Sequence, residues 1–322
     1  MVDLVHMRRR VGARLVARAF ERAAQIGGLA RQAKPEHHGL ERIKDVAYGA
    51  RPEHLLDVYR PRDADNAPVV FYVHGGAFAS LSKNTHWIMG LAFARRGFVV
   101  AMPDYRLSPE HRFPAHLEDT AAALRFVVDN ARSWGGDPSR IIFAGESAGA
   151  NLVTSLALCQ AYERDEPYAR IVRDQPTPLA VLAACGVFEV TNTQRFNDKF
   201  KLNWFIDDRF RELEMNYPAW ENGAPVPHDL MNPLLLVERE APKRALPPFF
   251  LPVGGGDHLR YDHERLEAAL KRHGVDVEAP VYGREPHAFH AFVLSKNAQR
   301  CWRDHWEFLA RHGVPVRDAP AI

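Results

Sequence analysis

The residues with the clearest chemical potential are Gly145-Glu146-Ser147-Ala148-Gly149, which form a G-x-S-x-G sequence. The run Ile141 to Ala144 before it is typical of a buried strand, and Asn151 to Tyr162 after it has helical composition. A serine at such a turn is held at the tip of a strained loop and can act as a nucleophile, with the N–H of Ala148 facing a developing oxyanion. Alone, the motif also fits an ordinary glycine-flanked turn.

A second glycine sequence could complete an oxyanion site. The apolar run Val69 to Val73 predicts a central strand and ends in His74-Gly75-Gly76-Ala77-Phe78. Glycines directly after a buried strand let the backbone turn and leave N–H groups free to face a ligand. Gly75 and Gly76 are therefore the candidates for the remaining oxyanion donors, although the same loop also fits a plain strand-to-helix turn.

An acid and a base follow two later strands. Asp257 comes after the predicted strand Phe249 to Val253, and His287 comes after Val277 to Tyr282. The carboxyl ends of parallel strands meet at one edge of a sheet, so Ser147, Asp257 and His287 can lie together despite their separation in the chain. The order serine, aspartate, histidine is that of a nucleophile with its base and orienting acid on an α/β fold.

The chain of 322 residues is long enough for one large α/β domain with an insertion, or for two ordinary domains, and its apolar and charged fractions are those of a soluble globular protein. A net charge of +2 gives no reason to expect a nucleic-acid partner. Three widely spaced cysteines suggest neither disulfides nor a zinc site, which favours a reducing, cytoplasmic location. We also find no metal-ligand spacing and no apolar run long enough to cross a membrane.

The N-terminal region is rich in arginine. Residues 1–34 hold eight Arg or Lys against Asp3 and Glu21, and their apolar residues recur at helical spacing. A membrane-surface helix and a transit peptide both fit this pattern, but we expect an ordinary helix that packs its apolar stripe on the body of the protein.

The coarse element pattern predicts three parts of the chain. Residues 1–42 would be an N-terminal helical part of a cap, and residues 43–190 with 247–322 would form the catalytic α/β domain. Residues 191–246 carry many aromatic and charged residues without a readable strand and helix pair, so we expect an inserted helical cap whose aromatics line a pocket or form its own core. Further helices are expected over 84–96, 115–134, 263–273 and 296–311, and further strands over 43–47, 55–59, 98–102 and 179–184.

The chain resembles the hormone-sensitive-lipase family of esterases within the α/β-hydrolase fold. The resemblance rests on H-G-G-x-x at His74 to Phe78, D-Y-R-L-x-P-E at Asp104 to Glu110, the elbow, and the segments around Asp257 and His287. It implies a mostly parallel sheet with helices on both faces and a helical cap. In the family a second aspartate often lies four residues after the acid, whereas here Asp262 lies five after Asp257 and stays a minor alternative. His290 follows His287 closely, and the resemblance assigns His287 as the base and His290 to structure or the pocket.

The resemblance implies a serine carboxylesterase that hydrolyses short- to medium-chain esters through an acyl-enzyme, without a cofactor or a metal. Its partner would be a small-molecule ester, with no nucleic acid and no stable membrane insertion. The family often forms dimers, and the last strand could present an edge for a homodimer. Two alternatives stay open: an amidase or formamidase with the same triad, and a receptor of this fold that binds a small ligand without chemistry.

Overall fold

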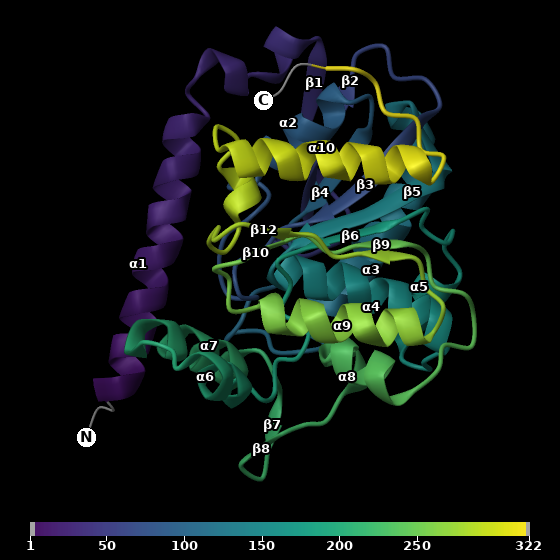
Figure 1. The fold of residues 1–322 in the computed structure, drawn as a ribbon. Helices are drawn as coiled ribbons and strands as arrows, with labels where there is room; N and C mark the ends of the chain where they lie inside the picture. The colour runs from purple at the N-terminus through teal and green to yellow at the C-terminus, as the bar shows by residue number, and fades with distance from the viewer. Residues whose placement is uncertain (1–3, 320–322) are drawn as a thin grey trace.

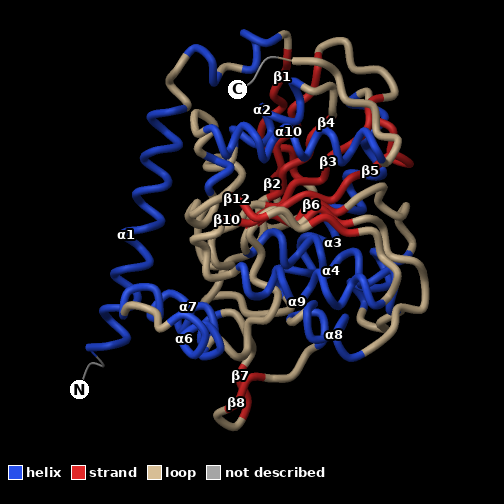
Figure 2. The backbone as a smooth tube through the Cα atoms, viewed as in Figure 1, coloured by secondary structure: helices blue, strands red, loops and turns tan. Residues whose placement is uncertain are grey.

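The computed structural model describes residues 4–319, in which an eight-stranded, mostly parallel sheet runs through the centre of the molecule (Figures 1 and 2). The strand order is β1-β2-β4-β3-β5-β6-β9-β11, and only the β1–β2 and β2–β4 pairs are antiparallel. The bounds of these strands are β1 Leu40–Ala47, β2 Leu55–Pro61, β3 Ala67–Val73, β4 Val99–Pro103, β5 Gly136–Glu146, β6 Val181–Ala184, β9 Phe249–Phe250 and β11 Val277–Glu278. A short parallel pair, β10 (Val253–Gly254) and β12 (Val281–Tyr282), continues from the last two strands.

Helices cover both faces of the sheet, as expected for an α/β-hydrolase fold (Figure 1). On one face lie α2 and α10, and on the other lie α3, α4 and α9. Their bounds are α2 Trp87–Arg95, α3 Ala115–Asn130, α4 Ala148–Tyr162, α5 Pro167–Arg173, α8 Pro233–Arg239, α9 Arg260–Arg272 and α10 Lys296–Arg311, with 3₁₀ turns at η1 Arg31–Ala33, η2 Pro35–His38, η3 Ala131–Trp134, η4 Asp229–Met231 and η5 Phe289–Ala291.

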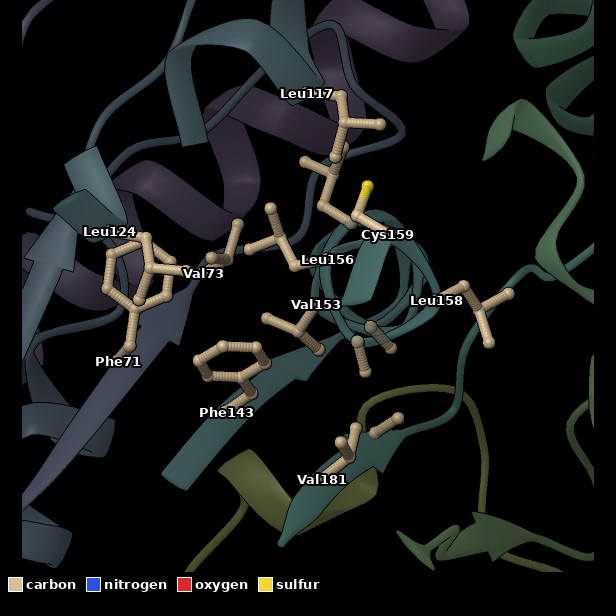
Figure 3. Packing of buried hydrophobic residues seen from close by; sticks show 14 of the residues in the cluster. Phe71, Val73, Leu117, Leu124, Phe143, Val153, Leu156, Leu158, Cys159 and Val181 are labelled. Atoms are coloured by element: carbon tan, nitrogen blue, oxygen red, sulfur yellow. The ribbon is translucent and has the colours of Figure 1, made fainter. Parts of the chain in front are cut away.

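The hydrophobic core follows directly from the sequence of the central strands. Every residue of β3 is buried, because a parallel strand covered on both faces has no solvent side. Side chains of β3 and β5 alternate between the two layers, so Phe71 and Phe143 face α3 and α4 while Val70 and Ile142 face α2 and α10. Figure 3 shows part of the first layer, where Val153 and Leu156 of α4 pack over the strands.

Two expected strands are each divided in the structure. The run Phe249 to Val253 forms β9 and β10, and the run Val277 to Tyr282 forms β11 and β12. The breaks fall at Pro252 and Pro280, which have no N–H to donate to the sheet. Apolar residues predict these strands, but the prolines within them end the regular pairing.

Several other boundaries differ by a few residues from the sequence expectation. β1 begins at Leu40 rather than at residue 43, so the expected N-terminal helical part ends before it. The expected helix over 115–134 is α3 followed by the 3₁₀ turn η3, and the helix expected from residue 263 begins at Arg260. The closing helix α10 has the expected bounds.

The region 191–246 holds two different structures. Its first part contains α6 (Gln194–Phe200), α7 (Trp204–Asn216) and a hairpin of β7 (Trp220–Glu221) and β8 (Ala224–Pro225). Its last part contains α8, which belongs to the main domain and not to a cap. This helix packs on α4 and α9, and its leucines join the main core. Asn203 begins α7 by accepting hydrogen bonds from the N–H groups of Phe205 and Ile206.

The N-terminal helix α1 (Leu4–Gly27) stands along one side of the molecule, apart from the helices that cover the two faces of the sheet (Figure 1). Its first turns contact α7, where Arg8 and Arg9 pair with the buried Asp208. Its last turn is held by Trp87, whose ring N–H donates to the carbonyl of Ala24 (3.0 Å). Within residues 4–319, no helix is both long and apolar enough to span a bilayer.

Candidate active site

Ser147 lies at a sharp turn between β5 and α4, and its backbone has φ 53° and ψ −118°. This conformation is strained for a residue with a side chain. The flanking positions must be glycine, because a Cβ at either one would clash with nearby backbone atoms. A Cβ on Gly145 would lie 2.7 Å from the backbone of Gly149, and a Cβ on Gly149 would lie 2.0 Å from the carbonyl oxygen of Val73. The turn therefore has the geometry of a nucleophile elbow.

The structure brings the three expected side chains into one chain of hydrogen bonds. His287 Nδ1 lies 2.8 Å from Asp257 Oδ2, and His287 Nε2 lies 3.1 Å from Ser147 Oγ. Because the carboxylate accepts the Nδ1–H, the Nε2 lone pair is directed at the serine hydroxyl. Asp257 is buried and also accepts the N–H of Leu259 (2.9 Å), so its carboxylate is fixed in orientation.

Asp257 and His287 each stabilise the charged form of the other. Burial alone would raise the pKa of Asp257, but His287 and the Leu259 N–H outweigh burial and lower that pKa. Burial alone would lower the pKa of His287, but the Asp257 carboxylate outweighs burial and raises it above 6.5. Since 42% of the His287 side chain is exposed, water offsets much of the burial, and the carboxylate dominates.

The two alternative residues from the sequence lie elsewhere. Asp262 is fully buried and forms an ion pair with Arg195 (2.7 Å), while its Oδ2 also accepts the N–H groups of Phe188 and Glu189. Asp262 therefore fixes the backbone around Phe188 and Glu189, just before the cap region. His290 is buried behind the elbow, with its Nε2 2.9 Å from Glu146 Oε2, and it makes no contact with the serine hydroxyl.

The glycine loop lies directly beside the elbow. A Cβ on Gly75 would come within 3.2 Å of Ser147 Cβ, and Gly76, with φ 118°, has no room for one beside the carbonyl of Ser80. Within the described residues, the N–H groups of Gly75 and Gly76 donate to no backbone carbonyl.

The D-Y-R-L-x-P-E loop holds the glycine loop in place. Tyr105 Oη donates to the carbonyl of His74 (2.9 Å), and its ring stacks on the His74 imidazole. Asp104 Oδ1 accepts the N–H of Lys83, and the Ser108 N–H donates to the carbonyl of Phe78. Burial lowers the pKa of His74 to about 3, so its neutral ring adds no charge behind the loop.

Glu146 is a site residue that the sequence analysis did not assign. Its buried carboxylate lies 2.6 Å from His86 Nε2 and 2.9 Å from His290 Nε2. Burial alone would raise the pKa of Glu146, but these two histidines outweigh it and lower the pKa well below its usual range. One carboxylate thus joins the elbow, the segment after the glycine loop and the loop that carries His287. The motif marks only the position of Glu146, because its partners come from distant segments.

A cavity of about 280 Å³ opens onto Ser147 and His287. Its roof comes from two distant segments, α1 and α7. The lining side chains include Val16 and Phe20 of α1 and Ile206, Phe210 and Leu213 of α7. Of the expected cap aromatics only Phe210 lines this cavity, and Phe196 stacks on it from the interior of the cap.

The Cys185, Asp257 and His287 side chains also lie within 4.8 Å of one another, which is close enough to hold a cation. Burial, however, raises the pKa of the Cys185 thiol well above its usual range. A protonated thiol is a poor metal ligand, and the other two residues are already paired with each other. The donor chemistry here fits a hydrogen-bonded triad better than a metal site.

Comparison with known proteins places this chain among related hydrolases. The family model of the α/β hydrolase fold matches residues 70–291. Carboxylesterase NlhH of Mycobacterium tuberculosis is 32% identical over 257 residues, which cover 78% of this chain and 74% of that protein. A probable isoprenylcysteine alpha-carbonyl methylesterase of Oryza sativa is 40% identical over 250 residues, 76% of this chain and 56% of that protein. The crystal structure of an esterase from the bacterial hormone-sensitive lipase family superposes with a TM-score of 0.72 at 26% identity, covering 92% of this chain and 90% of that one.

The chain therefore belongs to the α/β-hydrolase fold family, among the esterases related to hormone-sensitive lipase. It is a carboxylic ester hydrolase.

Proposed function

We propose that this esterase hydrolyses short- to medium-chain carboxylic esters through an acyl-enzyme on Ser147. The observation that carries the proposal is the continuous hydrogen-bonded chain from Ser147 Oγ through His287 to Asp257, placed at a strained elbow beside a glycine loop. Acyl transfer needs this arrangement, because a serine hydroxyl becomes an effective nucleophile only beside an oriented base.

The reaction has two halves. His287 takes the Ser147 proton as the oxygen attacks the ester carbonyl, and the N–H groups of Gly75, Gly76 and Ala148 receive the charge of the tetrahedral intermediate. His287 then protonates the leaving alcohol. In the second half, the same imidazole activates a water molecule that releases the acid and restores the serine.

The size and lining of the cavity support the proposed acyl-length range. At about 280 Å³ it lies at the low end of small-molecule sites, and its roof of Val16, Phe20, Phe210 and Leu213 is apolar. Such a cavity suits a short or medium acyl chain and disfavours a fully enclosed long one.

The test is hydrolysis of p-nitrophenyl esters from acetate to palmitate by the native chain and by Ser147→Ala. We expect activity to peak at short or medium chains and kcat to fall about 10⁶-fold in the variant, as in other serine triads. Near-normal turnover by Ser147→Ala would refute the acyl-enzyme, and a peak at palmitate would refute the acyl range. A matched anilide serves as the control for amide hydrolysis.

A further inference from the structure

We propose that the outer face of α1, with the turn that precedes α10, is a docking surface for an anionic lipid membrane. The proposal goes beyond ester hydrolysis, since it concerns where the esterase sits and does not depend on the catalytic mechanism. We call this surface the α1 face and define it by Val11, Leu15, Ile26, Leu29, Phe292 and Leu294, with the arginines Arg14, Arg18 and Arg22.

The apolar residues of the α1 face are unusually exposed. Leu15, Ile26 and Leu29 are 61%, 70% and 77% accessible, and Leu294, on the turn before α10, is 88% accessible. Figure 1 shows that α10 begins at its end nearest α1, so this turn and the helix lie on the same side of the molecule. Large apolar side chains left in water at one edge of a protein mark an interaction site.

The spacing of the residues along α1 separates two functions of the helix. Residues 11, 15, 18, 22 and 26 follow one another at intervals of three and four, which places them on one side of a helix. The opposite side carries Val16 and Phe20, which roof the catalytic cavity. A surface that covers the outer side would therefore lie about one helix diameter, roughly 10 Å, from the cavity.

Charge identifies the occupant. The helix carries six arginines against one acidic residue, Glu21, and the exposed Arg14, Arg18 and Arg22 form no ion pair within residues 4–319. Two copies that met through the same face in a symmetric dimer would bring these positive charges together. An anionic bilayer attracts them and accepts the apolar side chains between them, as for other surface-bound amphipathic helices.

The experiment measures binding without turnover. The full chain carrying Ser147→Ala would be floated with vesicles of phosphatidylcholine alone and of phosphatidylcholine with one third phosphatidylglycerol, at low salt and at 0.5 M salt. Three arginines near the surface predict a preference of about a hundredfold for the anionic vesicles, which weakens at high salt.

The variants locate the contact. Leu15→Glu with Ile26→Glu should abolish binding, whereas Trp220→Glu, on the exposed β7–β8 hairpin, should leave it unchanged. The same substitutions are also made in the chain that keeps Ser147, and these variants are assayed for hydrolysis of p-nitrophenyl acetate. Normal activity shows that each variant is folded, because none of the substituted residues lines the cavity.

Three results would overturn the proposal. The first is absence of binding to anionic vesicles, and the second is equal binding by the Leu15→Glu, Ile26→Glu variant. The third is an ultracentrifuge measurement in which the native chain is a dimer and this variant a monomer, because the face would then belong to a second copy of the chain.

Discussion

At the scale of single residues, the site depends on how two carboxylates control imidazole rings. Asp257 orients His287 and raises its pKa, while Glu146 is held between two other histidines, His86 and His290. In the proposed mechanism the Asp257 carboxylate acts on proton transfer through His287, whereas the Glu146 carboxylate joins the loops around the elbow. Asp257→Asn and Glu146→Gln should therefore change the kinetics of the enzyme in different ways.

The pH dependence of catalysis tests the role of Asp257. His287 must be neutral to accept the serine proton, so kcat/KM should fall with acid around a pKa above 6.5. In Asp257→Asn this acid limb should move to lower pH, and kcat should fall about 10⁴-fold because the imidazole loses its orientation. Asp276→Asn, at an exposed carboxylate that pairs with His312, is the control and should keep the native profile. An unchanged acid limb in Asp257→Asn would contradict the assignment.

Glu146→Gln tests whether this buried carboxylate positions the catalytic loops. The amide keeps the size of the side chain but gives up the charge that holds His86 and His290. Losing a charge-assisted hydrogen bond of this kind should lower kcat about 10- to 100-fold with little change in KM.

Two further measurements distinguish a positioning role of Glu146 from a purely structural one. The carboxylate also raises the pKa of His287, so Glu146→Gln should shift the acid limb of kcat/KM to lower pH. Glu146→Asp, which restores the charge, should recover part of kcat. Loss of thermal stability with normal kcat in the folded fraction would argue against positioning.

At the scale of elements, the roof of the cavity is held by few contacts. α1 joins α7 mainly through Asp208, which is buried against Arg8 and Arg9, and through the Arg209 guanidinium, which donates to the carbonyl of Arg9 (2.6 Å). Burial alone would raise the pKa of Asp208, but the two arginines outweigh it and lower that pKa. The position of α1 therefore depends on a single carboxylate more than on a large apolar interface.

Asp208→Asn should loosen α1 without disturbing the sheet. Because Arg8 is half exposed, we expect a loss of only about 1 kcal/mol of docking free energy, or about a fivefold increase in the open population. Brief trypsin digestion measures this, since α1 is rich in arginine. Asp207→Asn removes a pair within α7 itself, with Arg211, and should leave the cleavage rate of α1 unchanged. Equal rates for both variants would show that Asp208 does not hold the helix.

The elements that could be predicted from sequence are those specified locally. The bounds of α10 follow from its amphipathic pattern and from Ser295, whose hydroxyl accepts the N–H of Ala298. The elbow is likewise local, since both glycines and the serine lie within five residues. The hydrogen bonds of Glu146 and the pairing of α1 with α7 could not be predicted, because each joins segments that only the folded sheet brings together.

At the scale of the whole molecule, the proposed catalytic residues and the roof of the cavity come from separate parts of the chain. The sheet edge supplies Ser147, Asp257 and His287, whereas α1 and the segment around α7 supply most of the cavity roof. Substitutions in the roof can therefore change acyl preference without moving the triad. The same division places the α1 face and the cavity on opposite sides of one helix.

The contact between Arg8 and Asp208 spans 200 residues of sequence. On a ribosome that adds about 5 to 20 residues per second, α1 emerges roughly 10 to 40 s before the helix on which it docks. During that interval the last turn of α1 can already meet Trp87, but its first turns have no partner, and six of the eight strands of the main sheet are made before α7 can bind those turns. Translation order thus leaves the first turns of α1 undocked until α7 has been synthesised.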